Sequence, residues 1–186
     1  MKTKRKFYTG TGDDGTTGLL GEGSVEKFDT RMEALGTLDE LSAVLGLARS
    51  LVDSIDENLR IIALQKKIYE LMAEVAATAE NANLFHRITP EEVCGLEKDI
   101  DRLSMEVDIP DGFIVPGANG GSAAIALART VTRRAERRVA ELLKEGKITN
   151  QDLLRYLNRL SSLFFVLELH LTQLDQQKPT MARDTK

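Results

Sequence analysis

Hydrophobic residues recur at helical spacing through most of this 186-residue chain. The pattern predicts five helices, roughly over residues 28–52, 56–82, 89–107, 122–145 and 150–175. The clearest apolar stripe lies in the last segment, with members alternately four and three residues apart: Leu153, Leu157, Leu160, Phe164, Leu167, Leu171 and Leu174. Such a stripe is typical of a helix that packs along its neighbours in a bundle. The sequence therefore predicts an all-α five-helix bundle.

The segments between and beyond the predicted helices indicate one domain with short tails. The length suits a single domain with a buried core, and no linker or internal repeat divides residues 1–186. Residues 1–7 are expected to form a solvated basic tail, and residues 176–186 a polar, disordered tail. The longest connection, 108–121, is rich in glycine and proline turns. It encloses an apolar run that begins at Phe113, which the flanking turns can project outward or pack under the loop.

Composition excludes several classes of protein. A net charge of −4 argues against general nucleic-acid binding, and no apolar run approaches the length of a membrane span. The single cysteine, Cys94, excludes an internal disulfide, which together with the absence of a secretory signal favours the cytoplasm. His86 and His170 are far apart in sequence, so no metal-ligand spacing is present. We expect no nucleic-acid or membrane partner and no protein-bound metal.

A loop rich in glycine and threonine, Thr9–Thr17, precedes the first predicted helix. Its glycines, Gly10, Gly12 and Gly15, permit tight turns and let backbone N–H groups approach a ligand closely. The loop lacks the preceding strand of a dinucleotide fingerprint and the lysine of a Walker phosphate loop. Two interpretations remain open: a polyanion-binding loop of no common class, or a flexible turn of small residues.

The fourth predicted helix carries three arginines four residues apart, Arg129, Arg133 and Arg137. This spacing places them on one face, beside a predicted buried stripe of small residues. Guanidinium groups suit phosphate oxygens in bidentate geometry, so the face could bind a polyphosphate. The alternative is a solvated face balanced by Glu136 and Glu141.

Three further residues are candidates for the same chemistry. Lys27 lies where the glycine loop gives way to the first helix and could reach phosphates held by the loop. Asp39, one turn after Leu35, is expected near the buried side, where it would need a basic partner such as the arginine stripe. Asn158, at the edge of the last apolar stripe, either bonds a neighbouring helix or faces a ligand.

Taken together, these segments resemble the PduO-type ATP:cob(I)alamin adenosyltransferases. The resemblance runs from Tyr8 to about Leu167 and rests on four motifs in the order of that family. They are Tyr8-Thr9-x-x-Gly12-Asp13-x-Gly15-x-Thr17, Gly36-Thr37-Leu38-Asp39-Glu40-Leu41, Arg129-Thr130-Val131-x-Arg133-Arg134-Ala135-Glu136-Arg137 and Asn158-Arg159-Leu160-Ser161.

The resemblance implies a homotrimer with active sites between subunits. It implies that ATP, with Mg²⁺ on its phosphates, is bound by Tyr8, Thr9, Gly10, Thr11, Gly12, Asp13, Gly15, Thr16, Thr17, Lys27, Arg133, Glu136, Arg137 and Asn158. It also implies a salt bridge between Asp39 and Arg129 across the subunit interface. Arg133, Arg137 and Phe113 are implied to be the catalytic residues, with Phe113 closing the lower face of a corrinoid pocket.

The implied reaction is transfer of the 5′-deoxyadenosyl group of ATP to cobalt(I) of cobalamin or a related corrinoid, with release of triphosphate. The corrinoid supplies the nucleophile. The protein therefore needs only to position the two substrates, exclude water from them and neutralise the charge of the leaving group. A corrinoid reductase and an adenosylcobalamin-dependent enzyme are the implied partners.

Three departures from the family pattern leave alternatives open. Ala118-Asn119 stands where a second glycine is usual, Ser162 replaces an aspartate, and Glu168-Leu169 replaces an alanine-arginine pair. The alternatives are a non-catalytic ATP- or corrinoid-binding carrier that delivers adenosylated cofactor, and a helical interaction module whose arginines bind an acidic partner. The glycine loop disfavours the latter, because a partner-binding bundle has no need of it.

Overall fold

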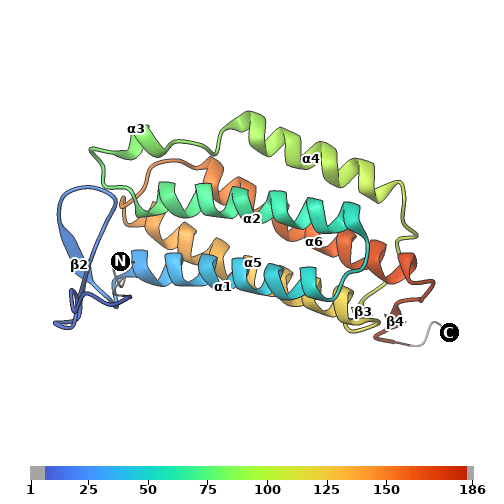
Figure 1. Ribbon diagram of the computed structural model, residues 1–186. Helices are drawn as coiled ribbons and strands as arrows, with labels where there is room; N and C mark the ends of the chain where they lie inside the picture. Colours follow the sequence, from blue (N-terminus) through green and yellow to red (C-terminus); the bar gives the residue numbers. More distant parts are fainter. Residues whose placement is uncertain (1–6, 184–186) are drawn as a thin grey trace, which may run out of the picture.

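The protein is described by a computed structural model, which covers residues 7–183. Long helices lie side by side in an elongated bundle (Figure 1), which confirms the predicted all-α fold. The long helices are α1 (Thr30–Ser50), α2 (Ile55–Ala76), α4 (Pro90–Ser104), α5 (Gly120–Lys144) and α6 (Asp152–Leu174). The helix predicted over 56–82 ends earlier, at Ala76, and a separate four-residue helix, α3 (Ala82–Phe85), follows it.

The helix starts are fixed by side chains that accept hydrogen bonds from free backbone N–H groups. Asn119 caps α5: its Oδ1 accepts from the Ser122 N–H at 2.7 Å, and the Ser122 hydroxyl accepts from the Asn119 N–H at 3.1 Å. Helix α6 begins at Asp152, two residues after the predicted start at about residue 150. Asn150 Oδ1 accepts from the Asp152 N–H at 2.9 Å and so satisfies one of the free N–H groups at this helix start.

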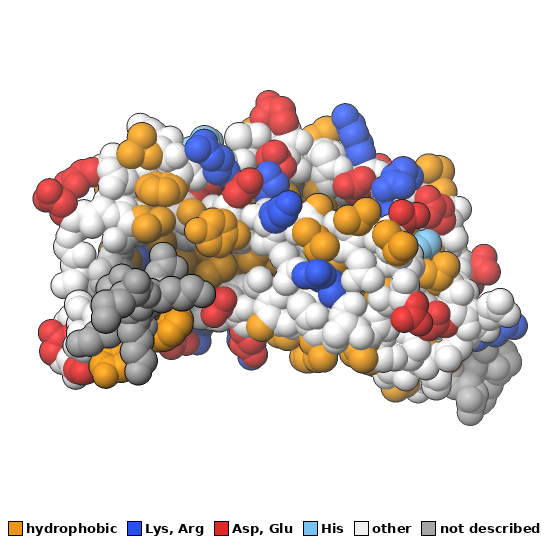
Figure 2. Space-filling model, viewed as in Figure 1, with side chains coloured by type: hydrophobic (Ala, Val, Ile, Leu, Met, Phe, Trp, Pro, Cys, Tyr) orange, Lys and Arg blue, Asp and Glu red, His pale blue; other side chains and the backbone are white. Residues whose placement is uncertain are grey.

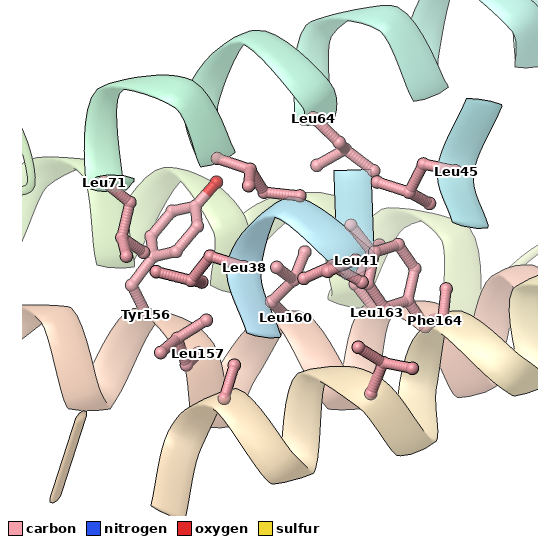
Figure 3. Close-up of a cluster of buried hydrophobic side chains, with 14 of the residues drawn as sticks. Leu38, Leu41, Leu45, Leu64, Leu71, Tyr156, Leu157, Leu160, Leu163 and Phe164 are labelled. Carbon is pink, nitrogen blue, oxygen red and sulfur yellow. The ribbon is translucent and has the colours of Figure 1, made fainter. Parts of the chain in front are cut away.

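The core lies between α6 and the helices that surround it (Figure 3). The predicted α6 stripe is buried except for Leu174, which is 50% exposed. Leucines of α1 and α2 meet this stripe in the close-up: Leu38, Leu41, Leu45, Leu64 and Leu71. The small buried residues of α5 are Ala128, Val131, Ala135 and Val139, as predicted. Small side chains let α5 approach α1 and α6 closely, which fixes the direction of its arginine face.

Two short antiparallel pairs lie at opposite ends of the bundle (Figure 1). At one end, β1 (Thr16–Gly18) pairs with β2 (Ser24–Glu26) next to the start of α1. At the other end, β3 (Ile114–Val115) pairs with β4 (Thr180–Met181) next to the start of α5. Leu20 joins the first pair to the bundle through backbone hydrogen bonds with Ala76 and Thr78, of 3.0 and 3.2 Å.

The tails behave differently from the prediction. The polar segment after residue 176 is not disordered up to residue 183, because β4 adds a strand to the connection that holds Phe113. The Ala182 N–H also donates to the Phe113 carbonyl oxygen at 2.8 Å. Polar composition gave no sign of this pairing, since the apolar partner lies more than sixty residues earlier in the chain. The basic tail was predicted over residues 1–7, of which residues 1–6 lie outside the described part.

The visible surface mixes hydrophobic and charged side chains over α1, α2 and α4 (Figure 2). Exposed apolar residues include Leu47 on α1 and Leu59 and Tyr69 on α2. Over residues 7–183, no helix combines the length and apolarity needed to cross a membrane.

Candidate functional site

The glycine loop is a chain of tight turns. Gly10, Gly12 and Gly15 have φ values of 75°, 89° and 91°, the left-handed region that favours glycine. The Asp13 N–H donates to the Gly10 carbonyl oxygen at 3.3 Å, and the Gly15 N–H donates to that of Gly12 at 3.1 Å. A Cβ atom on Gly12 would lie only 2.6 Å from the Thr16 carbonyl oxygen. The loop is therefore a defined structure that requires glycine, and not a flexible turn.

Lys27 lies against this loop, as its position in the sequence predicted. Its Nζ donates to the Gly12 carbonyl oxygen at 2.6 Å, and its N–H donates to that of Gly15 at 2.8 Å. Within the turn, the Thr16 N–H and hydroxyl both donate to Asp14 Oδ1, at 3.0 and 2.8 Å. These two bonds lower the pKa of the Asp14 carboxyl. A lysine cation thus stands beside the backbone of a fixed, glycine-rich turn.

The exit of the loop is anchored in the bundle by Asp29 and Arg31. Asp29 caps α1 and accepts from Lys147 Nζ at 2.8 Å, a contact that lowers the pKa of its carboxyl. Arg31 is only 7% exposed and donates to the carbonyl oxygens of Val75, Ala77 and Lys147, at 2.6, 2.8 and 2.7 Å. Burial lowers the pKa of this guanidinium, although the three hydrogen bonds that it donates satisfy it.

The arginine face of α5 continues onto α6. Asn158 Nδ2 donates to Glu136 Oε1 at 2.8 Å, and Arg133 Nη1 lies 3.5 Å from Glu136 Oε2. Of the two alternatives for Asn158, the structure shows the contact with a neighbouring helix. Arg133 and Arg137 are exposed. Glu141 pairs with Arg138 at 3.1 Å and not with the exposed Arg133 or Arg137. The face therefore presents more positive than negative charge.

An open cavity of about 600 Å³ lies between the start of this face and the connection after α4. It is lined by Gly112, Phe113, Ile114, Arg129, Arg133, Ser161, Ser162, Phe165 and Val166. Phe113 is 89% exposed, so its ring projects away from the core, and the alternative of a core contact under the loop is wrong. Aromatic rings next to two arginines make a site for a large flat ligand that also carries negative charge.

The departures from the family pattern lie next to this cavity or support it. Ser162 lines the cavity directly. Asn119 caps α5, and its Nδ2 also donates to the Leu171 carbonyl oxygen at 3.0 Å, which ties α5 to α6. Glu168 lies under Arg129, with 3.7 Å between its Oε2 and Arg129 Nε.

Two groups of predicted site residues are not brought together. Across residues 7–183, no hydrogen bond or ion pair joins the Gly12 loop or Lys27 to Arg133 or Arg137. The loop and the Phe113 connection lie at opposite ends of the bundle (Figure 1), along which the 25-residue α5 extends about 37 Å.

The expectation that Asp39 lies near the buried side is wrong for the single chain. Asp39 is exposed, because Met32 and Leu35, from which its position was counted, are themselves only half-buried on α1. Its predicted partner Arg129 lies instead against Glu168 of the same chain.

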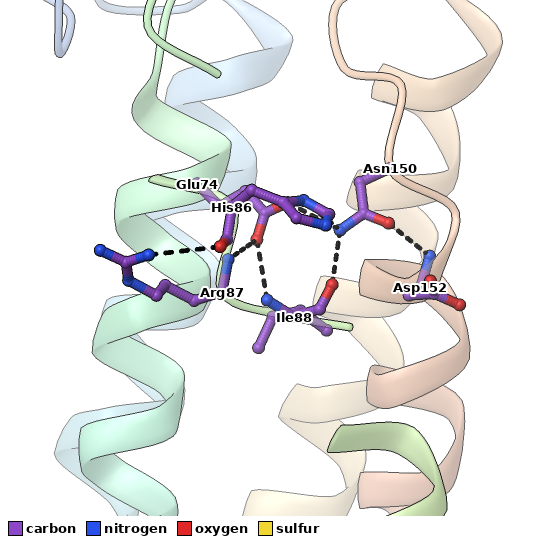
Figure 4. A network of polar contacts seen from close by, with 6 residues as sticks. All are labelled: Glu74, His86, Arg87, Ile88, Asn150 and Asp152. Atoms are coloured by element: carbon purple, nitrogen blue, oxygen red, sulfur yellow. Dashed lines mark hydrogen bonds and ion pairs between the residues drawn. The ribbon is translucent and has the colours of Figure 1, made fainter. Parts of the chain in front are cut away.

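A buried polar network that the sequence did not reveal lies at the loop end (Figure 4). Glu74 is 7% exposed and accepts from the N–H groups of Arg87 and Ile88, both at 3.1 Å. Its other oxygen contacts Asn150 Nδ2 at 2.7 Å and His86 Nδ1 at 3.0 Å. The network fixes the connections before α4 and α6. The sequence signal for this network was the position of Glu74, three residues after Leu71 on the apolar side of α2. In the part of the chain described, His, Cys, Asp and Glu form no group of three suited to a metal ion.

Comparison with known proteins identifies the family to which this arrangement belongs. The sequence profile described as cobalamin adenosyltransferase matches residues 7–171, so the chain is a member of that family. It is 38% identical over 164 residues to a corrinoid adenosyltransferase of Bacillus subtilis, covering 86% of this chain and 83% of the relative. It is 42% identical to the corrinoid adenosyltransferase PduO of Salmonella typhimurium over 87% of this chain and 48% of that longer protein.

Solved structures agree with this assignment. A variant of the PduO-type ATP:corrinoid adenosyltransferase from Lactobacillus reuteri, complexed with cobalamin and ATP, superposes with a TM-score of 0.89. The two proteins are 32% identical, and the match covers 96% of this chain and all of that one. The predicted family is therefore confirmed.

Proposed function

We propose that this protein transfers the 5′-deoxyadenosyl group of ATP to the cobalt(I) of cobalamin or a related corrinoid and releases triphosphate. The observation that carries the proposal is the cavity that Phe113, Arg129 and Arg133 help to line. A relative with a TM-score of 0.89 has cobalamin and ATP bound, which supports the same two ligands here. In the transfer, the cobalt electron pair forms the bond to C5′, and the C5′–O bond breaks as its electrons leave with triphosphate.

In this reaction the chain's own residues position the substrates and neutralise charge. Arg133, Arg137 and Lys27 bind the triphosphate, whose negative charge increases as the C5′–O bond breaks. Glu136 and Asn158, already joined to each other, hold the nucleotide on the α5–α6 side. Tyr8, Thr9 and the turns through Thr17 enclose ATP with backbone N–H groups and hydroxyls. Mg²⁺ accompanies the phosphates and needs few protein ligands.

A complete site requires two chains, because one chain holds the glycine loop and the Phe113 cavity at opposite ends. We propose a homotrimer in which the loop of one subunit faces the α5–α6 surface of the next. Asp39, exposed on α1, then pairs with Arg129 of a neighbouring subunit. Asp39→Arg should dissociate the assembly as judged by light scattering, and combination with Arg129→Asp should restore part of it. A fully active monomer would exclude this arrangement.

Phe113 has a separate role in the proposed site. Its exposed ring covers the lower face of the corrinoid and excludes a cobalt ligand, which makes Co(II) easier to reduce. Phe113→Ala should leave melting temperature and ATP affinity nearly unchanged, unlike a core substitution, which costs about 3–5 kcal/mol. The loss should fall on Co(II) reduction, and chemically reduced cob(I)alamin should rescue much of the rate. A large drop in melting temperature without such rescue would place the ring in a structural role.

The proposal places the protein in the cytoplasm, between a corrinoid reductase and an enzyme that uses adenosylcobalamin. One assay tests the activity: the protein is mixed with ATP and chemically reduced cob(I)alamin, and cob(I)alamin absorbance and triphosphate are followed. Loss of absorbance with stoichiometric triphosphate supports transfer. Binding of both ligands without triphosphate would indicate the carrier instead. That alternative is motivated by two departures from the family pattern, Ser162 at the cavity and Glu168 beneath Arg129.

A further inference from the structure

Glu168 on α6 is a buried acid whose charge is not satisfied by hydrogen bonds. It is 2% exposed, and its Oε2 has no hydrogen-bond partner among the described residues. Burial raises the pKa of its carboxyl, although the nearby Arg129 opposes the shift. A buried carboxylate without hydrogen-bond donors lowers the stability of the fold, so its presence indicates a role other than core packing.

The other two buried acids show how unusual this is. Glu74 accepts two backbone N–H bonds and contacts Asn150 and His86. Glu57 accepts from Arg60 Nε at 2.9 Å and lies 3.3 Å from His170 Nε2. Both are therefore tied into complete networks that hold helices and connections together.

Glu168 faces a single group, the guanidinium of Arg129. Arg129 Nε lies 3.7 Å from Glu168 Oε2 and is likewise buried without an acceptor. The same side chain is 27% exposed and lines the cavity that contains Phe113. A guanidinium has five N–H donors in a fixed plane, so an anion that holds the Nε edge sets the direction of the other donors.

We propose that Glu168 is a positioning residue, which holds the Nε edge of Arg129 from beneath and so orients its remaining N–H groups at the wall of the Phe113 cavity. This inference rests on the proposed function, in which that cavity binds the corrinoid. It assigns Arg129 two anionic neighbours, Glu168 within its own chain and Asp39 of the adjoining subunit. The family pattern has alanine at the position of Glu168, so this support is a feature of the present chain.

The first test separates pairing from activity through thermal unfolding of a double-mutant cycle. Arg129→Met leaves Glu168 buried opposite an apolar group and should lower the melting temperature by several degrees. Glu168→Gln added to Arg129→Met should recover part of that loss, because it removes the uncompensated charge. If the two effects are additive, the pairing is wrong, whatever the protein catalyses. Arg129→Lys serves in the same cycle if the methionine variant does not fold.

The second test measures whether the pair orients the cavity wall. Glu168→Gln should raise the KM for cob(I)alamin about tenfold, the effect of one weakened charged contact, and leave the KM for ATP within twofold. The same substitution in the Arg129→Met background should change neither value further. Glu57→Gln is the matched control, since it removes an equally buried carboxylate away from the cavity and should alter only stability.

An unchanged corrinoid KM in Glu168→Gln, or an equal further loss in the Arg129→Met background, would overturn the positioning role. Absence of adenosyl transfer in the parent protein would instead contradict the proposed function, and the unfolding cycle would still decide whether Glu168 and Arg129 are paired.

Discussion

The glycine loop and the α5–α6 face, the two regions that we propose bind ATP, are built in opposite ways. The loop, Thr9–Thr17, uses backbone groups in left-handed turns, and it is exposed and joined to the bundle by few bonds. The face uses charged side chains on two long, tightly packed helices, with Glu136 and Asn158 joined across them. Side chains on a rigid face can be removed one at a time, whereas the loop depends on its backbone geometry as a whole.

The largest expected effect lies on the helical face. Arg137→Ala should weaken ATP binding by about 1.5–3 kcal/mol, the size of a charge-assisted hydrogen bond in a partly enclosed site. Calorimetry with the nucleotide measures it directly. Arg134→Ala is the matched control, because Arg134 pairs with Glu40 of α1 on a different side of the helix. Equal ATP affinity in the two variants would reduce the stripe to a solvated surface.

The loop should respond to a change of a single methyl group. Gly12→Ala places a Cβ 2.6 Å from the Thr16 carbonyl oxygen at a φ of 89°, so the turn must rearrange. We expect ATP binding to weaken by about 1–3 kcal/mol, the usual strain of such a backbone position. Gly18→Ala, in the same hairpin but with open space around it, should bind ATP as the parent does. Similar affinities for both variants would mean that the turn does not contact the nucleotide.

Mixing these two impaired variants, at an ATP concentration too low for either alone, tests whether the regions meet between subunits. In a trimer formed from equal amounts of Gly12→Ala and Arg137→Ala chains, about a quarter of the interfaces combine an intact loop with an intact face. Adenosyl transfer should therefore recover toward that fraction after the chains are unfolded and refolded together. No recovery, despite mixed trimers demonstrated by mass spectrometry, would place both regions of a site in one chain.

A moderate effect is expected from the strand at the far end. Removing Lys178–Lys186 deletes β4 and the hydrogen bond from Ala182 to the Phe113 carbonyl oxygen. The KM for cob(I)alamin should rise severalfold, which corresponds to a loss of about 1 kcal/mol in binding free energy. ATP affinity should stay unchanged, because the glycine loop lies at the other end of the bundle. Deletion of Asp184–Lys186 alone serves as the control. An unaltered corrinoid KM in the longer deletion would show that Phe113 needs no support from β4.

The smallest effect concerns pH and the anchor of the loop. Lys147 and the Arg31 N–H lower the pKa of Asp29 below its usual 3.8, so the contact stabilises the fold above that pH. The stability is lost as pH falls through the lowered pKa. Asp29→Asn keeps the helix cap but loses the ion pair, and should cost about 0.3–1 kcal/mol at pH 7. Urea unfolding should show this difference shrinking as the pH falls below 3.8 and through the lowered pKa of Asp29. A difference that persists there would assign the effect to the cap.

Much of the bundle could be predicted because helical periodicity reports burial directly. The α6 stripe from Leu153 to Leu171 and the small residues of α5 are buried as their spacing indicates. The arginines Arg129, Arg133 and Arg137 share one face for the same geometric reason. For Phe113 the turns on either side left two orientations open, and the structure shows the outward one.

Contacts between distant segments could not be predicted in this way. The pairing of Thr180 with Val115 depends on where the chain returns after α6, which local composition does not record. Glu74 and Glu168 both occupy buried helix positions that are normally apolar. Periodicity shows that they interrupt an apolar stripe, but it does not show which groups they contact. The exposure of Asp39 depends on the tilt of α1, which half-buried Leu35 does not define.

The β3–β4 pair also has a consequence for how the protein is made. The chain emerges from the ribosome from its N-terminus, so the glycine loop and all the helices are synthesised before Thr180–Met181. The Phe113 connection consequently gains its second strand only after all of α6 has been made. A chain still in synthesis therefore completes the helices and the glycine loop before the end that carries Phe113, and a ribosome that stops between α6 and β4 would yield a bundle that lacks the second strand at that end alone.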